Sequence, residues 1–176
     1  MPSETNPRDS ARVLHEETIP FPLMQVLIWL FAIMSAVLLS LAAMQGVSGT
    51  ERSVFAGTLV PGLILLAVIA ILINYRKLKL AITDEAITVA YGAFRDTIPL
   101  GTVTAAYRDT ASALIRYGGW GIRFGRVEGR WRKVYNVIGC QNVVVRVTGR
   151  RVGELAFASR DPEKVLFLLN RMIRKS

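Results

Sequence analysis

The sequence has one cysteine and one histidine among its 176 residues. Cys140 cannot form a disulfide within the chain, which suits a cytoplasmic domain, and we expect it to be a small buried residue. His15 lies in a polar N-terminal segment, and nothing places it beside a nucleophile as a Ser-His-Asp or Cys-His arrangement requires. Metal sites need clustered His, Cys or carboxylate ligands, which the sequence lacks. We therefore expect a non-enzymatic protein with no metal, cofactor or small-molecule substrate.

Charged residues are absent from two long stretches, residues 21–44 and 53–74. About 20 apolar residues in a helix cross a hydrocarbon core of about 30 Å, and lipid requires every backbone group to be satisfied within the segment. The stretches predict two membrane-spanning helices, at about 21–44 and 53–75, joined by a short loop into a hairpin. The alternative for the first stretch is a cleaved signal peptide, but the stretch is longer than such a peptide's apolar part and no basic residue directly precedes it.

Positive charge is concentrated after the second stretch. Residues 1–75 hold three Lys or Arg and five Asp or Glu, a net charge of −2, and residues 76–176 hold nineteen and eight, a net charge of +11. Arg76, Lys77 and Lys79 follow the second span directly. Because cationic flanks stay on the cytoplasmic side, we predict a multi-pass protein with both termini in the cytoplasm. A basic domain held there attracts anionic lipids or an acidic protein, whereas the sequence has no helix-turn-helix or zinc-finger spacing that would indicate nucleic acid.

Small residues recur at helical spacing in both spans. Ala32, Ala36 and Ser40 lie four residues apart in the first span, and Gly57 and Gly62 lie early in the second. Small residues let helices approach closely in a membrane. Two interpretations remain open, packing of the two spans on each other and docking of the hairpin against a third helix.

The remaining residues divide into a polar tail and a domain of short strands. Residues 1–20 read as the tail, in which 9–17 could form a short helix. From residue 76 to 176 the apolar period changes to that of strands, with glycines at turn positions. The expected strands are 77–83, 86–92, 94–100, 103–109, 120–125, 133–138, 142–148 and 153–159. Residues 159–176 predict an amphipathic helix, with Ser159 or Asp161 as its cap and Pro162 at its first position.

Several strings in this part of the chain suggest a family. They are "YGGWGIR" at 117–123, "YNVIG" at 135–139, "VVVRVTG" at 143–149 and "FASRDPEKVLFLL" at 157–169. The chain resembles the bacterial membrane proteins that join two transmembrane helices to a cytoplasmic pleckstrin-homology-like (PH-like) domain. The resemblance implies an α+β membrane protein of the bacterial inner membrane. Its hairpin would be followed by a PH-like antiparallel β-barrel or sandwich, capped by the C-terminal amphipathic helix.

The stretch from 116 to 139 combines glycines, tryptophans and basic residues. Its glycines around Trp120 have a structural explanation, since they permit positive φ or a close backbone approach. The cations lie around a Gly-Arg-Val-Glu-Gly turn, and a hairpin from about 120 to 138 is expected to project them together. They are Arg123, Arg126, Arg130, Arg132 and Lys133, with Trp131 among them. Such a hairpin suits a membrane surface or an acidic groove of a partner, although it could also be an ordinary solvated hairpin.

Two functions follow from these observations. The first is an accessory or scaffold subunit of a larger membrane complex (respiratory, photosynthetic or transport), docked by the hairpin and the PH-like domain. The second is a membrane-tethered module that binds anionic lipid headgroups. The residues expected to bind lipid or partner are the six of the basic hairpin together with Arg76, Lys77 and Lys79.

Overall fold

The computed structural model describes residues 12–47, 52–109 and 119–174 of the chain. The chain divides into two compact units. One is continuous, Pro20–Arg76, and the other combines the described residues before this segment with those from Lys77 onward. The helical unit is therefore inserted, in chain order, between the first strand of the other unit and the rest of it.

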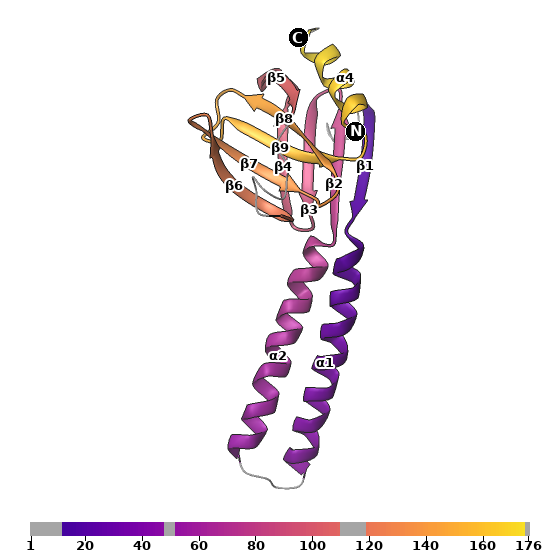
Figure 1. Ribbon diagram of the computed structural model, residues 1–176, viewed down its shortest axis with the longest axis vertical. Coiled ribbons are helices and arrows are strands. Elements are labelled where there is room, and N and C mark those ends of the chain that lie inside the picture. The colour runs from indigo at the N-terminus through magenta and orange to yellow at the C-terminus, as the bar shows by residue number, and fades with distance from the viewer. Residues whose placement is uncertain (1–11, 48–51, 110–118, 175–176) are drawn as a thin grey trace, which may run out of the picture. The chain divides into compact units, whose positions relative to one another are not determined.

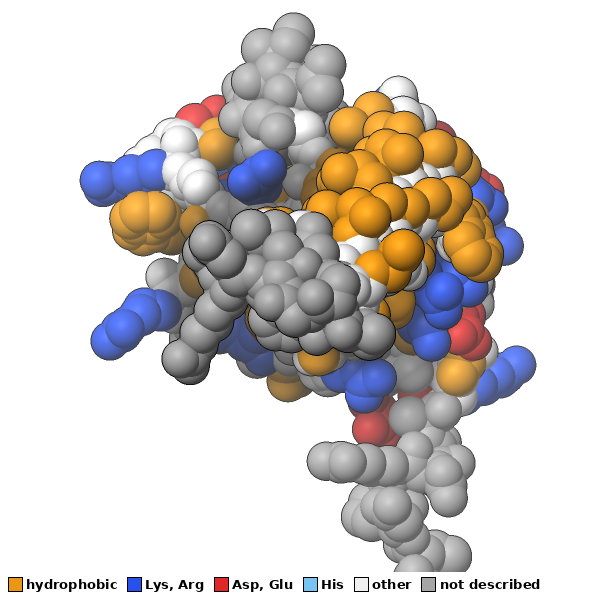
Figure 2. Space-filling model, turned by 90° about the horizontal axis from the view of Figure 1, so that it is seen from below, with side chains coloured by type: hydrophobic (Ala, Val, Ile, Leu, Met, Phe, Trp, Pro, Cys, Tyr) orange, Lys and Arg blue, Asp and Glu red, His pale blue; other side chains and the backbone are white. Residues whose placement is uncertain are grey.

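The continuous unit consists of two long helices (Figure 1), α1 (Pro22–Val47) and α2 (Arg52–Tyr75). Their most apolar parts are Pro22–Met44 and Gly57–Tyr75, with 23 and 19 residues. At about 1.5 Å per residue, both parts are about as long as a bilayer core is thick. In an apolar window of 18 residues within each part, only 17% and 6% of the residues are buried, so neither resembles the core helix of a soluble protein. Many of their large side chains are exposed, among them Trp29, Ile33 and Ile64, and Figure 2 shows hydrophobic side chains gathered on one part of the visible surface. The two helices therefore fit a membrane-spanning protein.

The contact between α1 and α2 includes one buried glycine. Gly62 is buried, and a Cβ added to it would lie 2.9 Å from Cδ2 of Leu39, which is too close for an unshifted side chain. Ser35 adds a hydrogen bond, since its hydroxyl donates to the carbonyl of Gly62 over 3.2 Å. At the other end of the hairpin, the N–H of Phe21 donates to the carbonyl of Arg76 over 3.0 Å. The two ends of the hairpin therefore meet, as an antiparallel pair of spans requires.

The other predicted small residues are less buried than Gly62. Ala32 is half-buried, whereas Ala36, Ser40 and Gly57 are exposed, and the Ser40 hydroxyl donates to the carbonyl of Ala36 in its own helix. A Cβ on Gly57 would meet nothing within 4 Å. The expectation that this whole set packs the two spans together is therefore wrong for these three exposed residues. Docking against a third helix stays a prediction.

The second unit contains two β-sheets and a C-terminal helix (Figure 1). The four-stranded sheet has the order β1-β2-β3-β4, and the five-stranded sheet has the order β5-β8-β9-β7-β6. The strands of the first sheet are β1 (Val13–Pro20), β2 (Lys77–Thr83), β3 (Ala86–Tyr91) and β4 (Phe94–Pro99). A short 3-10 helix, η2 (Leu100–Thr102), leads to the second sheet, which comprises β5 (Val103–Arg108), β6 (Gly121–Val127), β7 (Arg130–Asn136), β8 (Gln141–Val147) and β9 (Glu154–Ser159).

Much of the core of this unit lies between the two sheets, and a smaller buried cluster of Val134, Val144 and Ala156 lies on the other face of the five-stranded sheet. Alternate residues of β2 and β3 are fully buried, as a strand with one covered face requires. Tyr91 of β3 stacks on Tyr135 of β7 with ring centroids 6.2 Å apart, and its hydroxyl donates to the carbonyl of Asn136 over 2.7 Å. Burial raises the pKa of Tyr91. Helix α4 (Pro162–Ile173) packs against β5, β8 and β9 and buries Val165 and Leu169.

The strand pattern confirms the predicted α+β class, but the sheets differ from the expected antiparallel barrel or sandwich in their closure and in the direction of one strand pair. All eight predicted strands and the C-terminal helix are present, and Asp161 caps that helix by accepting a hydrogen bond from the Lys164 N–H. Neither sheet closes into a barrel, however. The pairing is also not purely antiparallel, because β7 and β9 run parallel. The possible helix at 9–17 is wrong where the structure describes it, since Val13–Pro20 forms strand β1.

Candidate functional site: the basic hairpin and a cationic pocket

The basic hairpin predicted from the sequence is formed by β6 and β7. Its register pairs Arg126 with Trp131 and Phe124 with Lys133. Directly opposed residues share a face of the sheet, and successive residues alternate between faces. These four residues therefore lie on the face turned toward the four-stranded sheet. Phe124 and Trp131 are 62% and 55% exposed, respectively, so this face carries two large aromatic groups in contact with solvent.

The other basic residues of the hairpin lie on the opposite face. The register pairs Arg130 with Val127 and Arg132 with Gly125, and it places Arg123 opposite Val134. Arg123 and Arg130 are exposed, whereas Arg132 is 3% exposed. The expectation that the hairpin projects its cations together is therefore wrong, because the pleat of the strands divides them between two faces and one of them is buried.

Arg132 is held in a network of buried charges on this outer face. Its Nη2 and Nε donate to Glu154 Oε2 over 2.6 and 2.9 Å, and its Nη1 donates to Asp109 Oδ2 over 3.2 Å. The Tyr107 hydroxyl accepts from Arg132 Nη2 over 3.1 Å and donates to Glu154 Oε1 over 2.9 Å. Arg146 reaches Glu154 Oε1 over 3.4 Å. A guanidinium shared by two buried carboxylates serves the fold, and Arg132 is not available to a lipid or a partner.

The network also sets the proton affinity of its members. Burial raises the pKa of Glu154, but the hydrogen bonds from Arg132, Tyr107 and Arg146 outweigh burial and hold the pKa below its ordinary value of 4.5. Burial, followed by the hydrogen bond to Glu154, raises the pKa of Tyr107. A pocket of about 420 Å³ lies beside these groups, lined in part by Tyr107, Asp109, Arg132 and Arg146. The buried charges beside this pocket already pair with one another, so they do not favour a charged ligand there.

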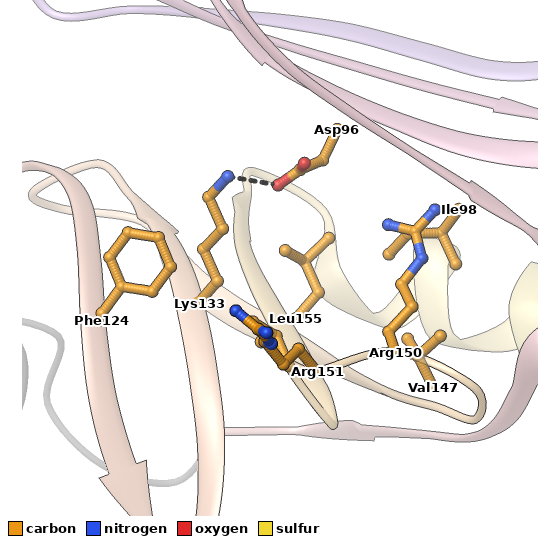
Figure 3. Close-up of a pocket in the computed structure, with 9 residues that line it drawn as sticks. Asp96, Ile98, Phe124, Lys133, Val147, Arg150, Arg151 and Leu155 are labelled. Carbon is orange, nitrogen blue, oxygen red and sulfur yellow. Dashed lines mark ion pairs between the residues drawn. The ribbon is translucent and has the colours of Figure 1, made fainter.

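A second pocket, of about 310 Å³, opens between the two sheets on the inner side of the hairpin (Figure 3). Its apolar lining comes from β4, β6, β8, β9 and the turn between β8 and β9. The residues are Ile98, Phe124, Val147, Val152 and Leu155. This volume lies at the lower end of the range of small-molecule sites, which are mostly apolar with a few polar groups at fixed positions.

The charged lining of this pocket is predominantly positive. Lys133, Arg150 and Arg151 contribute three positive charges and Asp96 contributes one negative charge, which leaves a net +2. Lys133 Nζ lies 2.7 Å from Asp96 Oδ2, and Arg150 Nη2 donates to the carbonyl of Thr97 over 2.5 Å. Figure 3 shows Lys133 directed at Asp96, with Arg150 and Arg151 beside the apolar floor. The pocket therefore combines an apolar floor with three cations at its rim, of which Lys133 and Arg150 are held by contacts with β4.

Arg150 and Arg151 were not among the residues singled out from the sequence. They lie in the turn between β8 and β9, and Arg150 is 14 residues beyond Asn136, the last residue of β7. The parallel pairing of β7 with β9 sets Lys133 opposite Leu155 and so brings the turn to the hairpin. The only local signal was the pair of adjacent arginines in a glycine-flanked turn, "GRRVG" at 149–153.

The other residues predicted to bind lipid or a partner lie outside the β6–β7 hairpin. Arg76, Lys77 and Lys79 are exposed where the chain passes from α2 into β2. The glycines near Trp120 have the predicted structural role, since Gly119 and Gly121 have φ of 100° and 102°.

Cys140 is half-buried, and His15 lies in β1. Burial raises the pKa of the Cys140 thiol, and the carboxylate of Glu17 raises it further, which makes the thiolate scarcer. His15 Nε2 lies 3.7 Å from Glu17 Oε2. Among residues 12–47, 52–109 and 119–174, no group of three or more His, Cys, Asp or Glu side chains could hold a metal ion.

No protein-family model, curated protein or solved structure matches the chain. The resemblance to two-helix membrane proteins with a PH-like domain therefore stays a prediction.

Proposed function

We propose that this chain is a non-enzymatic accessory subunit of a larger membrane complex, anchored by α1 and α2 and docked through the inner face of the β6–β7 hairpin. The observation that carries the proposal is the exposure of Phe124 and Trp131, at 62% and 55% of their surface, on one face beside Arg126. Exposed aromatic residues with a neighbouring arginine are the side chains that most often anchor protein interfaces. Arg126 is itself oriented, since its Nε donates to the carbonyl of Gly129 over 3.2 Å.

The membrane-type helices support the same function. Each carries apolar side chains around its circumference, and Ala36, Ser40 and Gly57 are exposed on them. Small exposed residues on a spanning helix permit close packing of another helix. A hairpin of this kind suits lateral association with a larger membrane protein, while the strand domain docks on a part of the complex outside the bilayer.

The buried polar groups favour a structural role over a catalytic one. Arg132, Asp109 and Glu154 satisfy one another, and the raised pKa of Cys140 is opposite to what a thiolate nucleophile requires. Catalytic sites keep such groups accessible to substrate. The chain instead uses them to fix its strands.

The second candidate function is binding of anionic lipid headgroups at the membrane surface. The exposed residues Arg76, Lys77 and Lys79 favour it, because they follow α2 directly and cations there interact with anionic lipid. The basic hairpin supports it less than the sequence suggested, since Arg132 is buried and the remaining cations lie on two faces.

The experiment is extraction of the tagged full-length chain from its native membrane in a mild detergent, followed by blue-native electrophoresis and mass spectrometry. An accessory subunit migrates in a large assembly that persists in high salt, because its contacts are largely apolar. Replacement of Phe124 and Trp131 by serine is expected to weaken this assembly at least tenfold, since truncation of one interface anchor costs about 2 kcal/mol or more.

The matched control is Phe167→Ser, which removes a 65% exposed aromatic group from α4. It should leave the assembly intact. Migration of the unaltered chain near its own 19.5 kDa plus detergent, with no constant companion, would contradict the proposal. Equal loss of the assembly in the control and the double variant would show that the hairpin face is not the docking site.

A further inference from the structure

The 310 Å³ pocket between the sheets has features that the proposed docking function does not use. Docking needs exposed surface, and Phe124 and Trp131 supply it. The pocket lies behind that surface, where β4 faces β7 and β9, and its floor consists of Ile98, Val147 and Leu155. These side chains belong to both sheets, so the floor is formed only when the sheets pack together.

Lys133, one of the three cations of the pocket, is held in position by its neighbours. Asp96 accepts from the Tyr135 hydroxyl over 2.8 Å and lies 2.7 Å from Lys133 Nζ, so this carboxylate is fixed from two directions. Lys133 Nζ also lies 5.1 Å from the ring centroid of Tyr135 and 5.5 Å from that of Phe124. An ammonium group has three N–H donors, so the contact with Asp96 leaves donors for a ligand.

The two arginines extend this positive group along the pocket. Arg150 uses one N–H group on the carbonyl of Thr97, which fixes its guanidinium against β4. Arg151 is exposed, and within the described parts of the chain it makes no hydrogen bond or ion pair. A guanidinium suits a carboxylate or a phosphate, to which it can donate two parallel hydrogen bonds. Among the described residues that line the pocket, Asp96 is the one acidic side chain, so the three cations leave a net charge of +2 that an anion would complement.

We propose that this pocket binds a small anionic amphiphile, a molecule with one phosphate or carboxylate group on a short apolar body. The anionic group of the ligand lies between Lys133, Arg150 and Arg151. Its apolar body covers some or all of the apolar surface formed by Ile98, Phe124 and Leu155. An inorganic anion leaves the floor uncovered, and a neutral apolar molecule leaves the cations unpaired. A molecule that carries both an anionic group and an apolar body should therefore bind this pocket more tightly than a molecule with only one of them.

The test is isothermal titration calorimetry of hexyl phosphate into the full-length chain in phosphatidylcholine nanodiscs, with empty discs subtracted. Hexyl phosphate is expected to bind, with affinity that falls as salt is added. Each methylene removed, from hexyl to butyl phosphate, should weaken binding about fourfold, because a buried CH₂ contributes about 0.8 kcal/mol. Inorganic phosphate and hexanol should each bind more weakly than hexyl phosphate.

The variant that tests the site is Arg151→Glu, with Arg171→Glu on the exposed face of α4 as the matched control. Arg151→Glu should weaken hexyl phosphate binding at least tenfold and leave the midpoint of thermal unfolding unchanged. Arg171→Glu should leave binding as it is. Equal binding by both variants, equal binding of hexanol and hexyl phosphate, or no binding by the intact chain would overturn the proposal.

A second set of nanodiscs distinguishes the sources of such a ligand. If phosphatidic acid in the disc suppresses hexyl phosphate binding, the pocket takes the anionic group from a lipid headgroup. If binding is the same in both discs, the ligand comes from solution. The result is independent of the proposed docking function, which Trp131→Ser alone tests without altering the lining of the pocket.

Discussion

Arg132 and Lys133 are adjacent cations on β7, yet the fold uses them in opposite ways. The side chain of Arg132 is 4% exposed and pairs with two carboxylates on the outer face of its sheet. The side chain of Lys133 is 21% exposed and pairs with one carboxylate, Asp96, at the rim of a pocket on the inner face. The difference arises from the pleat alone, since both belong to the same basic string. Composition identifies a basic segment, but the register decides which of its cations remain accessible.

The largest expected effect comes from removal of the buried member. Arg132→Met should lower the free energy of unfolding by about 3–5 kcal/mol, because it leaves Glu154 and Asp109 buried without their cation. The measurement is urea unfolding of the full-length chain in a nonionic detergent, followed by tryptophan fluorescence. Neutralising the carboxylates in the same chain, with Glu154→Gln and Asp109→Asn, should recover part of the loss. A loss below about 1 kcal/mol for Arg132→Met would show that the network is not the structural element described above.

The second prediction concerns pH and the same network. The pKa of Glu154 is lower in the folded chain than its ordinary value of 4.5, so its contribution to stability is present above about pH 4.5 and is lost as the pH falls through the lower folded value. The thermal midpoint should therefore fall below pH 4.5, and Glu154→Gln should reduce the steepness of that fall even though it also lowers the midpoint itself. Glu85→Gln, which alters an exposed carboxylate in the turn between β2 and β3, serves as the control. Identical pH profiles for the two variants would contradict the assignment.

The third prediction concerns the inner face. Tyr135→Phe removes the hydroxyl that donates to Asp96 over 2.8 Å and should cost about 1 kcal/mol of stability, the usual net value of one hydrogen bond. Lys133→Met should cost no more than about 1 kcal/mol, because its ion pair is partly solvated. The comparison with Arg132→Met in the same urea experiment is the direct test. Equal losses for Lys133→Met and Arg132→Met would remove the distinction between the faces.

The smallest effect is expected for Arg123, an exposed cation on the outer face of β6. Arg123→Glu should change stability by less than about 0.5 kcal/mol, as surface substitutions usually do. It should also leave hexyl phosphate binding unchanged, because the register places Arg123 on the side of the sheet away from the pocket. Loss of binding in this variant would mean that long-range charge, and not the pocket geometry, attracts the anion.

Local pattern was sufficient to predict most of the elements. The alternation of "KLKLAIT" at 77–83 predicted β2, and the Pro162 start with its apolar face predicted α4, because in both cases period and end signals agree. Strand β1 was missed because its segment is polar and its structure comes from pairing with β2 in the sheet. Closure into a barrel could not be judged either, since it depends on contacts between strands distant in the sequence.

The candidate site was only half predictable. The turn at Glu128–Gly129 fixes the register of the hairpin, and counting alternate residues from that turn would have separated Arg126 from Arg130 and Arg132. The contribution of Arg151 could not be found in this way. Arg151 reaches the pocket because β7 pairs in parallel with β9, and no local sequence pattern specifies that pairing.

Strand β1 also imposes an order on how the protein is made. It precedes the helical unit in the chain but pairs with β2, which follows that unit, and Glu17 of β1 accepts hydrogen bonds from the Ser159 hydroxyl over 2.9 Å and the Arg160 N–H over 2.7 Å. The strand synthesised first must therefore wait for the hairpin and β2 before it can pair, and its Glu17 must wait for Ser159 and Arg160 before it can accept their hydrogen bonds. A fragment that begins at Lys77 would lack this strand and expose the edge of β2, where another chain could pair. During biosynthesis, the strand domain can therefore be completed only after the helical hairpin has been synthesised.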